Sequence, residues 1–188
     1  MNRSFVAVAA VASLAVAGWI GWVAEDLRQQ DQGVQARWAE LHAAEQTQFA
    51  EVPAVLALAD RQPALDATVK AGARSRCSPL EQLNNGASLI DDAQQFDHYK
   101  QVRAECTGTL FRLLAAIHSD PVMSADGHVQ ALGQSLTHGQ AAVDIARERY
   151  RQALVAYNRG IRKLPQRLAA GLLGYRERPD LVRYAEGA

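Results

Sequence analysis

The sequence has little cysteine, few aromatic residues and no net charge, and each shortage excludes a class of protein. Two cysteines among 188 residues are too few for a disulfide framework, and their spacing is too long for a zinc knuckle. Zero net charge, with no run that pairs Lys or Arg with stacking aromatics, argues against binding nucleic acid. The hydrophobic content of 48% is enough for one compact domain.

The sequence also lacks the residue spacings of common catalytic sites. The five histidines form no H-E-x-x-H or Glu-x-x-His pattern, and Gly133-Gln134-Ser135 does not complete G-x-S-x-G. A zinc site at one turn has candidate ligands in His118, Asp120, Asp126 and His128, but solvated polar residues are the favoured interpretation. We therefore predict no enzyme activity, no cofactor and no metal site.

Residues 5–24 are apolar, uncharged and long enough to cross a bilayer as a helix of roughly 30 Å. Arg3 precedes this stretch, and Trp19 and Trp22 lie near its end as interface residues do. We predict a retained transmembrane helix. The alternative is a signal peptide cleaved after Ala17, because Ala15-Val16-Ala17 is a small-x-small site.

We predict three long helices after this stretch. We predict no strand, because no segment shows the period-two alternation that is typical of one. The first continues from Glu25 with an apolar stripe broken only by Glu45, bends or breaks at Pro53, and ends near Gly72. Residues 73–90 form the main interruption and include a short helical segment. The second long helix covers residues 91–118, and the third starts between 123 and 128 and stops at 164–165. LAAGLL, residues 168–173, forms a last helical turn.

The two cysteines are predicted to lie in different settings. Cys106 falls on the apolar stripe of the second long helix, roughly 24 Å from its start, where a buried thiol is ordinary. Cys77 falls in a loop that reaches at most about 17 Å from the end of the first helix. A bridge needs that loop to fold back along the bundle, so unpaired thiols are favoured and pairing stays open.

Charge is unevenly distributed along the chain. Residues 4–146 carry nine basic and sixteen acidic side chains, whereas residues 147–183 carry ten basic and three acidic ones. The favoured interpretation is a basic last helix packed against more acidic helices, and the alternative is a basic surface for anionic lipid or an acidic partner. Tyrosines on this helix are expected to be buried with bonded hydroxyls, or else to line a polar groove that accepts a peptide or helix. The candidate interaction surface comprises Arg147, Arg149, Tyr150, Arg151, Tyr157, Asn158 and Arg162.

The carboxy-terminal part of the sequence contains Ala146-Arg147, Arg149-Tyr150, Tyr157-Asn158, Ile161, Pro165, Ala170-Gly171-Leu172 and Gly174-Tyr175, and Trp38, Leu41 and Val52-Pro53 precede them in matching register. This pattern resembles the LemA family over nearly the whole chain and is specific at the carboxy-terminal run. Ala50, Ala54 and Arg151 depart from polar positions of the family. The resemblance implies an all-α, up-and-down antiparallel bundle of three long helices plus a short one, with an N-terminal transmembrane helix and no known enzyme activity.

We therefore expect a membrane anchor at residues 1–24, a helical bundle at 25–175 and a tail at 176–188. The predicted protein is a single-pass, non-enzymatic interaction or scaffold module of the bacterial cytoplasmic (inner) membrane, with its domain on the extracytoplasmic side. Its expected partners are the bilayer, through residues 5–24, and an unidentified envelope protein. The alternative is a secreted, soluble ligand-binding bundle released by cleavage after Ala17.

Overall fold

The computed structural model describes residues 2–63, 65–82 and 87–180, and these residues form helices and connecting turns without a strand. The predicted all-α class is therefore confirmed. The helices are α1 (Asn2–Phe49), α2 (Val52–Asp60), α3 (Ala67–Gln82), the 3₁₀ helix η1 (Ala87–Asp91), α4 (Ala93–His118), α5 (Pro121–Ser124), α6 (Gly127–Arg162) and α7 (Gln166–Leu173).

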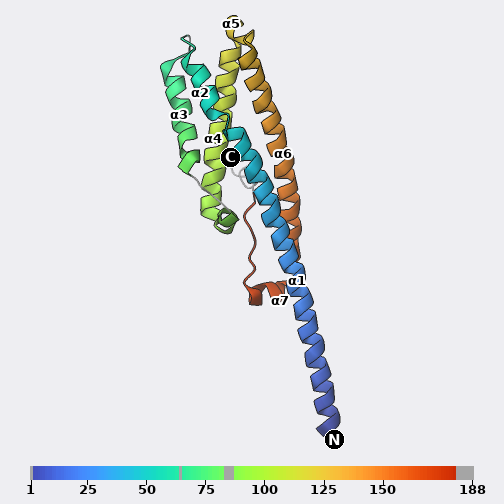
Figure 1. Ribbon diagram of the computed structural model, residues 1–188. Coiled ribbons are helices and arrows are strands. Elements are labelled where there is room, and N and C mark those ends of the chain that lie inside the picture. The colour runs from blue at the N-terminus through green and yellow to red at the C-terminus, as the bar shows by residue number, and fades with distance from the viewer. Residues whose placement is uncertain (1, 64, 83–86, 181–188) are drawn as a thin grey trace.

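The two closest helix pairs of the bundle, α1 with α6 and α3 with α4, pack antiparallel (Figure 1). The chain ascends through α1 and α2, descends in α3, ascends in α4 and descends in α6. Three long helices were expected and are present as α1, α4 and α6. The expectation of one short helix was too low, because α2, α3, α5 and α7 all accompany them.

The first long helix breaks where its proline predicts a break. α1 ends at Phe49, and Pro53 occupies the first turn of α2, where its missing N–H leaves no hydrogen bond unmade. The predicted end near Gly72 is wrong. α2 stops at Asp60, and a separate helix, α3, runs through Gly72, because Ala73 and Cys77 on its inner face are buried against α4.

The remaining boundaries follow from local capping. The Asp92 side chain accepts hydrogen bonds from the backbone N–H groups of Gln94 and Gln95 at 2.9 and 3.1 Å, which starts α4. Asp126 caps α6 in the same way through the N–H of His128 at 2.7 Å. The predicted second helix, the start of the third and the terminal helical turn, here α7, are confirmed.

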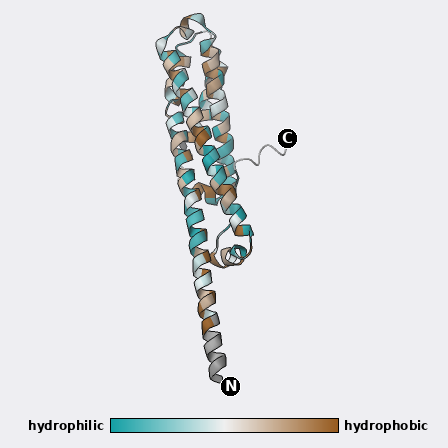
Figure 2. Ribbon diagram, turned by 90° about the vertical axis from the view of Figure 1, so that its right-hand side faces the viewer, coloured by the Kyte–Doolittle hydropathy of each residue, from teal (hydrophilic) through white to brown (hydrophobic). Residues whose placement is uncertain are grey.

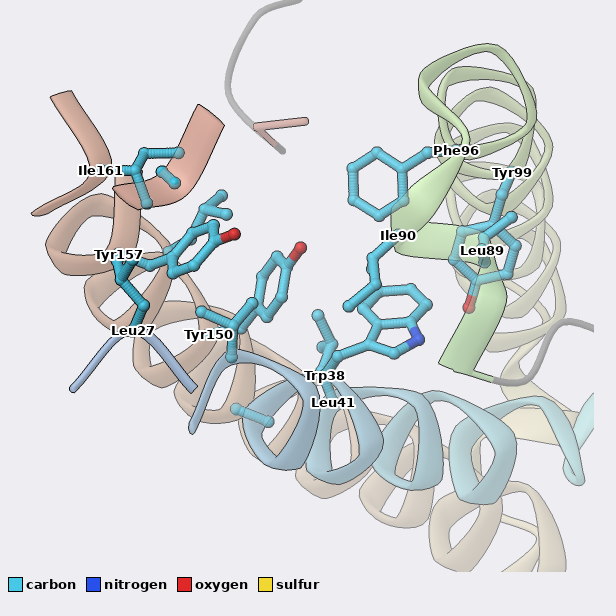
Figure 3. Close-up of a cluster of buried hydrophobic side chains, with 14 of the residues drawn as sticks. Leu27, Trp38, Leu41, Leu89, Ile90, Phe96, Tyr99, Tyr150, Tyr157 and Ile161 are labelled. Atoms are coloured by element: carbon cyan, nitrogen blue, oxygen red, sulfur yellow. The ribbon is translucent and has the colours of Figure 1, made fainter. Parts of the chain in front are cut away.

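The core consists of two apolar clusters along the bundle. The first surrounds Trp38 of α1, whose ring centroid lies 5.5 Å from that of Phe96, 5.8 Å from that of Tyr99 and 5.6 Å from that of Tyr150. Figure 3 shows these side chains converging from α1, α4 and α6. The second cluster joins α2, α3, α4 and the first half of α6. Together they position α6 along nearly its whole length.

The cysteines form a disulfide, so the interpretation that favoured unpaired thiols is wrong. The Cα atoms of Cys77 and Cys106 are 4.7 Å apart, and both residues are buried. Cys77 lies in a helix and not in a loop, and α3 runs antiparallel along α4. The antiparallel packing of α3 on α4 brings Cys77 back beside the middle of α4. A disulfide between the two cysteines requires the chain to fold back in this way.

The predicted membrane span, residues 5–24, belongs to α1. Its side chains at residues 5–10 and at residue 12 lie outside those that the structure describes. Among the helical residues that are described, no stretch combines the length and the apolar character needed to cross a membrane.

The disulfide is expected to stabilise the bundle strongly. It closes a loop with a sequence separation of 29 residues, for which the chain-entropy account gives about 3 to 4 kcal/mol of unfolding free energy. Urea unfolding of the oxidised protein, compared with the Cys77→Ser/Cys106→Ser double variant, measures this difference. Reductant should lower the stability of the unmodified protein and leave that of the double variant unchanged. If reductant leaves the unfolding free energy of the unmodified protein unchanged, that result contradicts the disulfide.

Candidate functional site

The seven residues of the predicted interaction surface all lie on α6, but two of them are not on the surface. The side chains of Tyr150 and Tyr157 are 0% and 1% exposed, and both belong to the apolar cluster around Trp38. The prediction that they form part of a surface is therefore wrong. The alternative expectation, burial of both rings, is confirmed, and Tyr157 also has the expected hydroxyl partner, the carbonyl oxygen of Arg176.

The arginines of α6 are exposed to different degrees and are largely paired. Arg149 and Arg151 are exposed, and Arg151 pairs with Glu148 at 2.7 Å. Arg147 is partly buried and pairs with Asp144 at 3.0 Å. These two pairs lie within α6, so neighbouring residues of the same helix offset part of its positive charge.

A C-terminal strap, which we define as residues 175–180, turns back onto the bundle after α7. Gly174 ends α7 with φ at 79°, a left-handed conformation that favours glycine. The Asn158 side chain then forms two hydrogen bonds with one strap residue, donating from Nδ2 to the carbonyl oxygen of Arg178 and accepting from its N–H, each at 3.0 Å. Tyr157 donates to the carbonyl oxygen of Arg176 at 3.0 Å.

The strap is also held by the Arg178 side chain. Its Nε and Nη2 donate to Asp31 of α1 at 2.9 and 2.7 Å, and its Nη1 donates to Asp91 of η1. Burial lowers the pKa of Arg178, but its bonds and ion pairs with the two aspartates outweigh this and leave the pKa above its ordinary value. Lys100 donates to the carbonyl oxygen of Asp180 at 3.0 Å. The described part of the predicted tail therefore packs against the bundle.

A buried charged cluster joins α1, α4 and α6 near Trp38. Glu45 is only 2% exposed, its carboxylate lies 2.8 Å from the Arg103 guanidinium, and it accepts a hydrogen bond from the Tyr99 hydroxyl. Burial raises the pKa of Glu45 against the opposing effects of Arg103 and Tyr99, while burial lowers that of the nearby Arg147. The Nε atom of Arg147 is buried without a hydrogen-bond partner among the residues that are described.

The sequence contains a signal of this cluster that was not used to predict it. Glu45 is the one charged residue that interrupts the apolar stripe of the first long helix, and a charge on a buried face requires a partner from another helix. The identity of that partner, Arg103, depends on how α1 and α4 pack. The bonds of Glu45 with Arg103 and Tyr99 join α1 to α4.

The candidate zinc ligands are not brought together. Asp120 caps α5 and accepts from Gln62 Nε2 at 2.6 Å, Asp126 caps α6, and the Nδ1 atom of His118 lies 3.0 Å from the Leu114 carbonyl oxygen. In the described ranges, no group of three or more His, Cys, Asp or Glu side chains is placed to hold a metal ion.

A pocket of about 280 Å³ lies where α1 passes into α2 and faces α3 and α4. It is mainly apolar, and Tyr99, which lines it, donates a hydrogen bond from its hydroxyl to the buried Glu45. Ala50, where the family resemblance implies a polar residue, lies on its wall. The lining residues are His42, Gln46, Phe49, Ala50, Val52, Pro53, Cys77, Leu80 and Tyr99.

Removing the Glu45 carboxylate is expected to destabilise the bundle by about 3 to 5 kcal/mol, because Arg103 then keeps a partly buried charge without its partner. The variant is Glu45→Ala, and chemical denaturation measures the unfolding free energy. The matched control is Glu40→Ala on the same helix, at an exposed pair with Arg37. This control should change stability far less, and equal losses in the two variants contradict the assigned role of Glu45.

The raised pKa of Glu45 also predicts a pH dependence. The folded protein holds the carboxyl proton more tightly than the unfolded chain, so the stability gained is present at low pH and is lost as the pH rises above the ordinary value near 4.5. Relative to Glu45→Gln, which cannot titrate there, the unfolding free energy of the unmodified protein should fall with rising pH. Denaturation curves between pH 4 and 8 measure this slope. If the unfolding free energy of the unmodified protein instead rises with pH relative to that of Glu45→Gln, the pKa of Glu45 is not raised.

Loss of the Asn158 side chain is expected to release the strap. Asn158→Ala removes two hydrogen bonds of roughly 1 kcal/mol each, so the opened strap becomes at least about tenfold more populated. Trypsin cleavage after Arg176, followed by mass spectrometry, measures this population. Gln152→Ala, which affects only a surface contact with Glu148, is the control. Equal cleavage rates for the two variants show that Asn158 does not hold the strap.

Comparison with known proteins agrees with the resemblance seen in the sequence. The LemA family matches residues 48–186, a range that includes Val52-Pro53, all of α6 and the strap, whereas Trp38 and Leu41 precede it. A search among curated proteins gave no match. The family match covers well over half of the chain, and the chain therefore belongs to the LemA family.

Proposed function

We propose that this protein is a single-pass membrane protein whose helical bundle serves as a non-enzymatic interaction module at the bacterial inner membrane. The observation that carries the proposal is the apolar surface of α1 outside the bundle. The N-terminal part of α1 extends past the other helices in both views (Figures 1 and 2). Burial within the bundle begins at Val23, which is 0% exposed.

The apolar residues before Val23 are not confined to one side of the helix. At 100° per residue, positions 14, 19 and 20 lie on widely separated sides, and their side chains are 73%, 39% and 38% exposed. A helix that is apolar all round is either buried in protein or inserted in a bilayer. The exposed apolar side chains described here are Val11, Leu14, Val16, Trp19, Ile20 and Trp22.

The length and ends of this segment support the same proposal. Residues 5–22 carry no charge and extend about 27 Å at helical rise, close to the thickness of a hydrocarbon core. Trp19 and Trp22 stand at the end nearer the bundle, where tryptophans favour the membrane interface. The charged residues Glu25 and Asp26 follow immediately.

The disulfide supports an extracytoplasmic bundle. Disulfides persist in oxidising compartments and are rare in the reducing cytoplasm. Cys77 and Cys106 are buried and close enough to bond, so oxidation requires no rearrangement. Arg3 before the apolar stretch is consistent with a cytoplasmic amino terminus.

A role in interaction and not in catalysis is supported by the contacts of the polar side chains. Glu45, Asn158 and Arg178 hold helices or the strap together. The exposed part of the predicted surface, with Arg149 and Arg151, remains the proposed contact for an envelope protein. Photo-crosslinking from position 149 in cells, compared with position 112 on the exposed side of α4, tests that contact. Equal recovery of partners from both positions counts against it.

The alternative function, a secreted ligand-binding bundle, draws on the pocket beside Tyr99. In that case signal cleavage removes residues 1–17. Intact mass of the mature protein separates the two, because the full mass supports the anchor and the loss of residues 1–17 supports secretion.

A charge placed in the proposed anchor should weaken membrane retention. Leu14→Asp puts a carboxylate at the centre of the span at a cost of about 3 kcal/mol. We expect the unmodified chain to stay in the membrane pellet after carbonate washing and this variant to shift to the soluble fraction. Ile145→Asp, at another exposed apolar residue on α6, is the matched control and should stay in the pellet. Unmodified protein that washes off refutes the anchor.

A further inference from the structure

We propose that the groove between α1, η1 and α6, which the strap fills, is a recognition site for an extended, arginine-bearing segment of a partner protein. The strap then occupies the site in cis until such a segment replaces it. This inference adds a second binding surface to the proposed contact at Arg149 and Arg151 and names the chemistry of the segment that it binds, and it rests on the proposed interaction function.

Apart from the ion pair between Arg162 and Glu177, α6 contacts the strap through the strap's backbone. Asn158 bonds both the N–H and the carbonyl oxygen of residue 178, and Tyr157 bonds the carbonyl oxygen of residue 176, two positions earlier. Contacts to alternate carbonyl groups of an extended chain do not depend on its side chains. They therefore accept any segment that adopts an extended conformation.

One side-chain position of the site is selective. Asp31 and Asp91 approach the Arg178 guanidinium from two different elements, and the Asp31 and Arg178 side chains are only 15% and 10% exposed. The guanidinium carbon also lies 6.0 Å from the centroid of the Tyr157 ring. Two carboxylates and an aromatic face suit a planar guanidinium, and a lysine ammonium cannot reproduce the same set of donors.

The aromatic cluster next to the strap contains a polar group, the Tyr150 hydroxyl, that has no bond within the described part of the chain. The Tyr150 hydroxyl is buried and has no hydrogen-bond partner among the described side chains and backbone. Tyr150 belongs to the same cluster of buried residues as Tyr157, whose hydroxyl bonds the strap. Figure 3 shows the hydroxyl oxygens of Tyr150 and Tyr157 on the same side of the aromatic cluster. A different segment that presents an acceptor there gains a hydrogen bond that the strap does not make.

The strap is short, contains no helix of its own and is joined to α7 through Gly174. Its Glu177 pairs with Arg162 of α6, and its Tyr175 packs against the aromatic cluster. An incoming segment therefore has to replace these contacts as well as the strap's hydrogen bonds. Occupation in cis lowers the apparent affinity for an external segment in proportion to the fraction of chains whose groove is open.

The test is binding of a fluorescein-labelled peptide with the sequence of residues 174–180, GYRERPD, to the full chain in detergent micelles. The unlocked variant is Arg178→Glu, which repels the strap from Asp31 and Asp91. The matched control is Arg167→Glu, an exposed residue of α7 with the same change of charge. A second peptide carries Arg178→Lys. Fluorescence anisotropy gives the dissociation constants.

We expect Arg178→Glu to bind the arginine peptide at least about tenfold more tightly than the unmodified chain or Arg167→Glu does, because its groove is open. The lysine peptide should bind at least about tenfold more weakly than the arginine peptide, and adding Asp31→Asn should abolish binding. A folded Arg178→Glu variant that binds the two peptides equally, or binds neither, overturns the proposal.

A second measurement applies if Arg178→Glu does not fold. In the unmodified chain the N–H of Arg178 is bonded to Asn158 and should exchange slowly with deuterium. Excess arginine peptide should accelerate that exchange by displacing the strap, and unchanged exchange overturns the proposal. Membrane retention is not involved in either measurement, so failure here is distinguishable from failure of the proposed anchor.

Discussion

The packing of α1 against α6 around Trp38 is the constraint on which the rest of the structure depends. The indole is 1% exposed and contacts aromatic rings from both α4 and α6. Buried aromatic residues of this kind contribute several kcal/mol each, and paired rings add about 0.5 to 1.5 kcal/mol beyond the area that they bury. Trp38 therefore fixes the spacing of three helices at one level of the bundle.

Two polar features depend on that level. Glu45 lies two turns further along α1, where packing against α4 brings Arg103 to its carboxylate. Asp31 lies two turns before Trp38, where it meets Arg178 of the strap. A rotation of α1 about its axis would separate both pairs and leave charges buried, at a cost of several kcal/mol. The apolar stripe and the ion pairs therefore specify the same orientation of α1, and the proposed membrane segment continues that helix.

How much the sequence predicts depends on how far apart the interacting residues are. Asp92, Asp126 and Pro53 act on their own turn of chain, so the helix ends that they set were predictable. The family was also recognisable, because its signature lies in one continuous run on α6 and α7. The separate helix α3 was not predicted, because Gly72 and the turn residues after it resemble a loop until burial against α4 is known. Its Cys77–Cys106 bridge was missed for that reason. The strap contacts join residues up to 147 positions apart, and no local pattern reports them.

The most direct test of the account is the distance between spin labels on either side of Val23. Gly18→Cys and Ala36→Cys place labels at exposed positions on one face of α1, and the native cysteines are paired and do not react. Eighteen residues of continuous helix separate the two Cα atoms by about 27 Å. With the protein in a bilayer, the account predicts a single narrow distribution of distances near that value. A broad distribution, or a main peak far below it, would show that α1 bends between the membrane and the bundle.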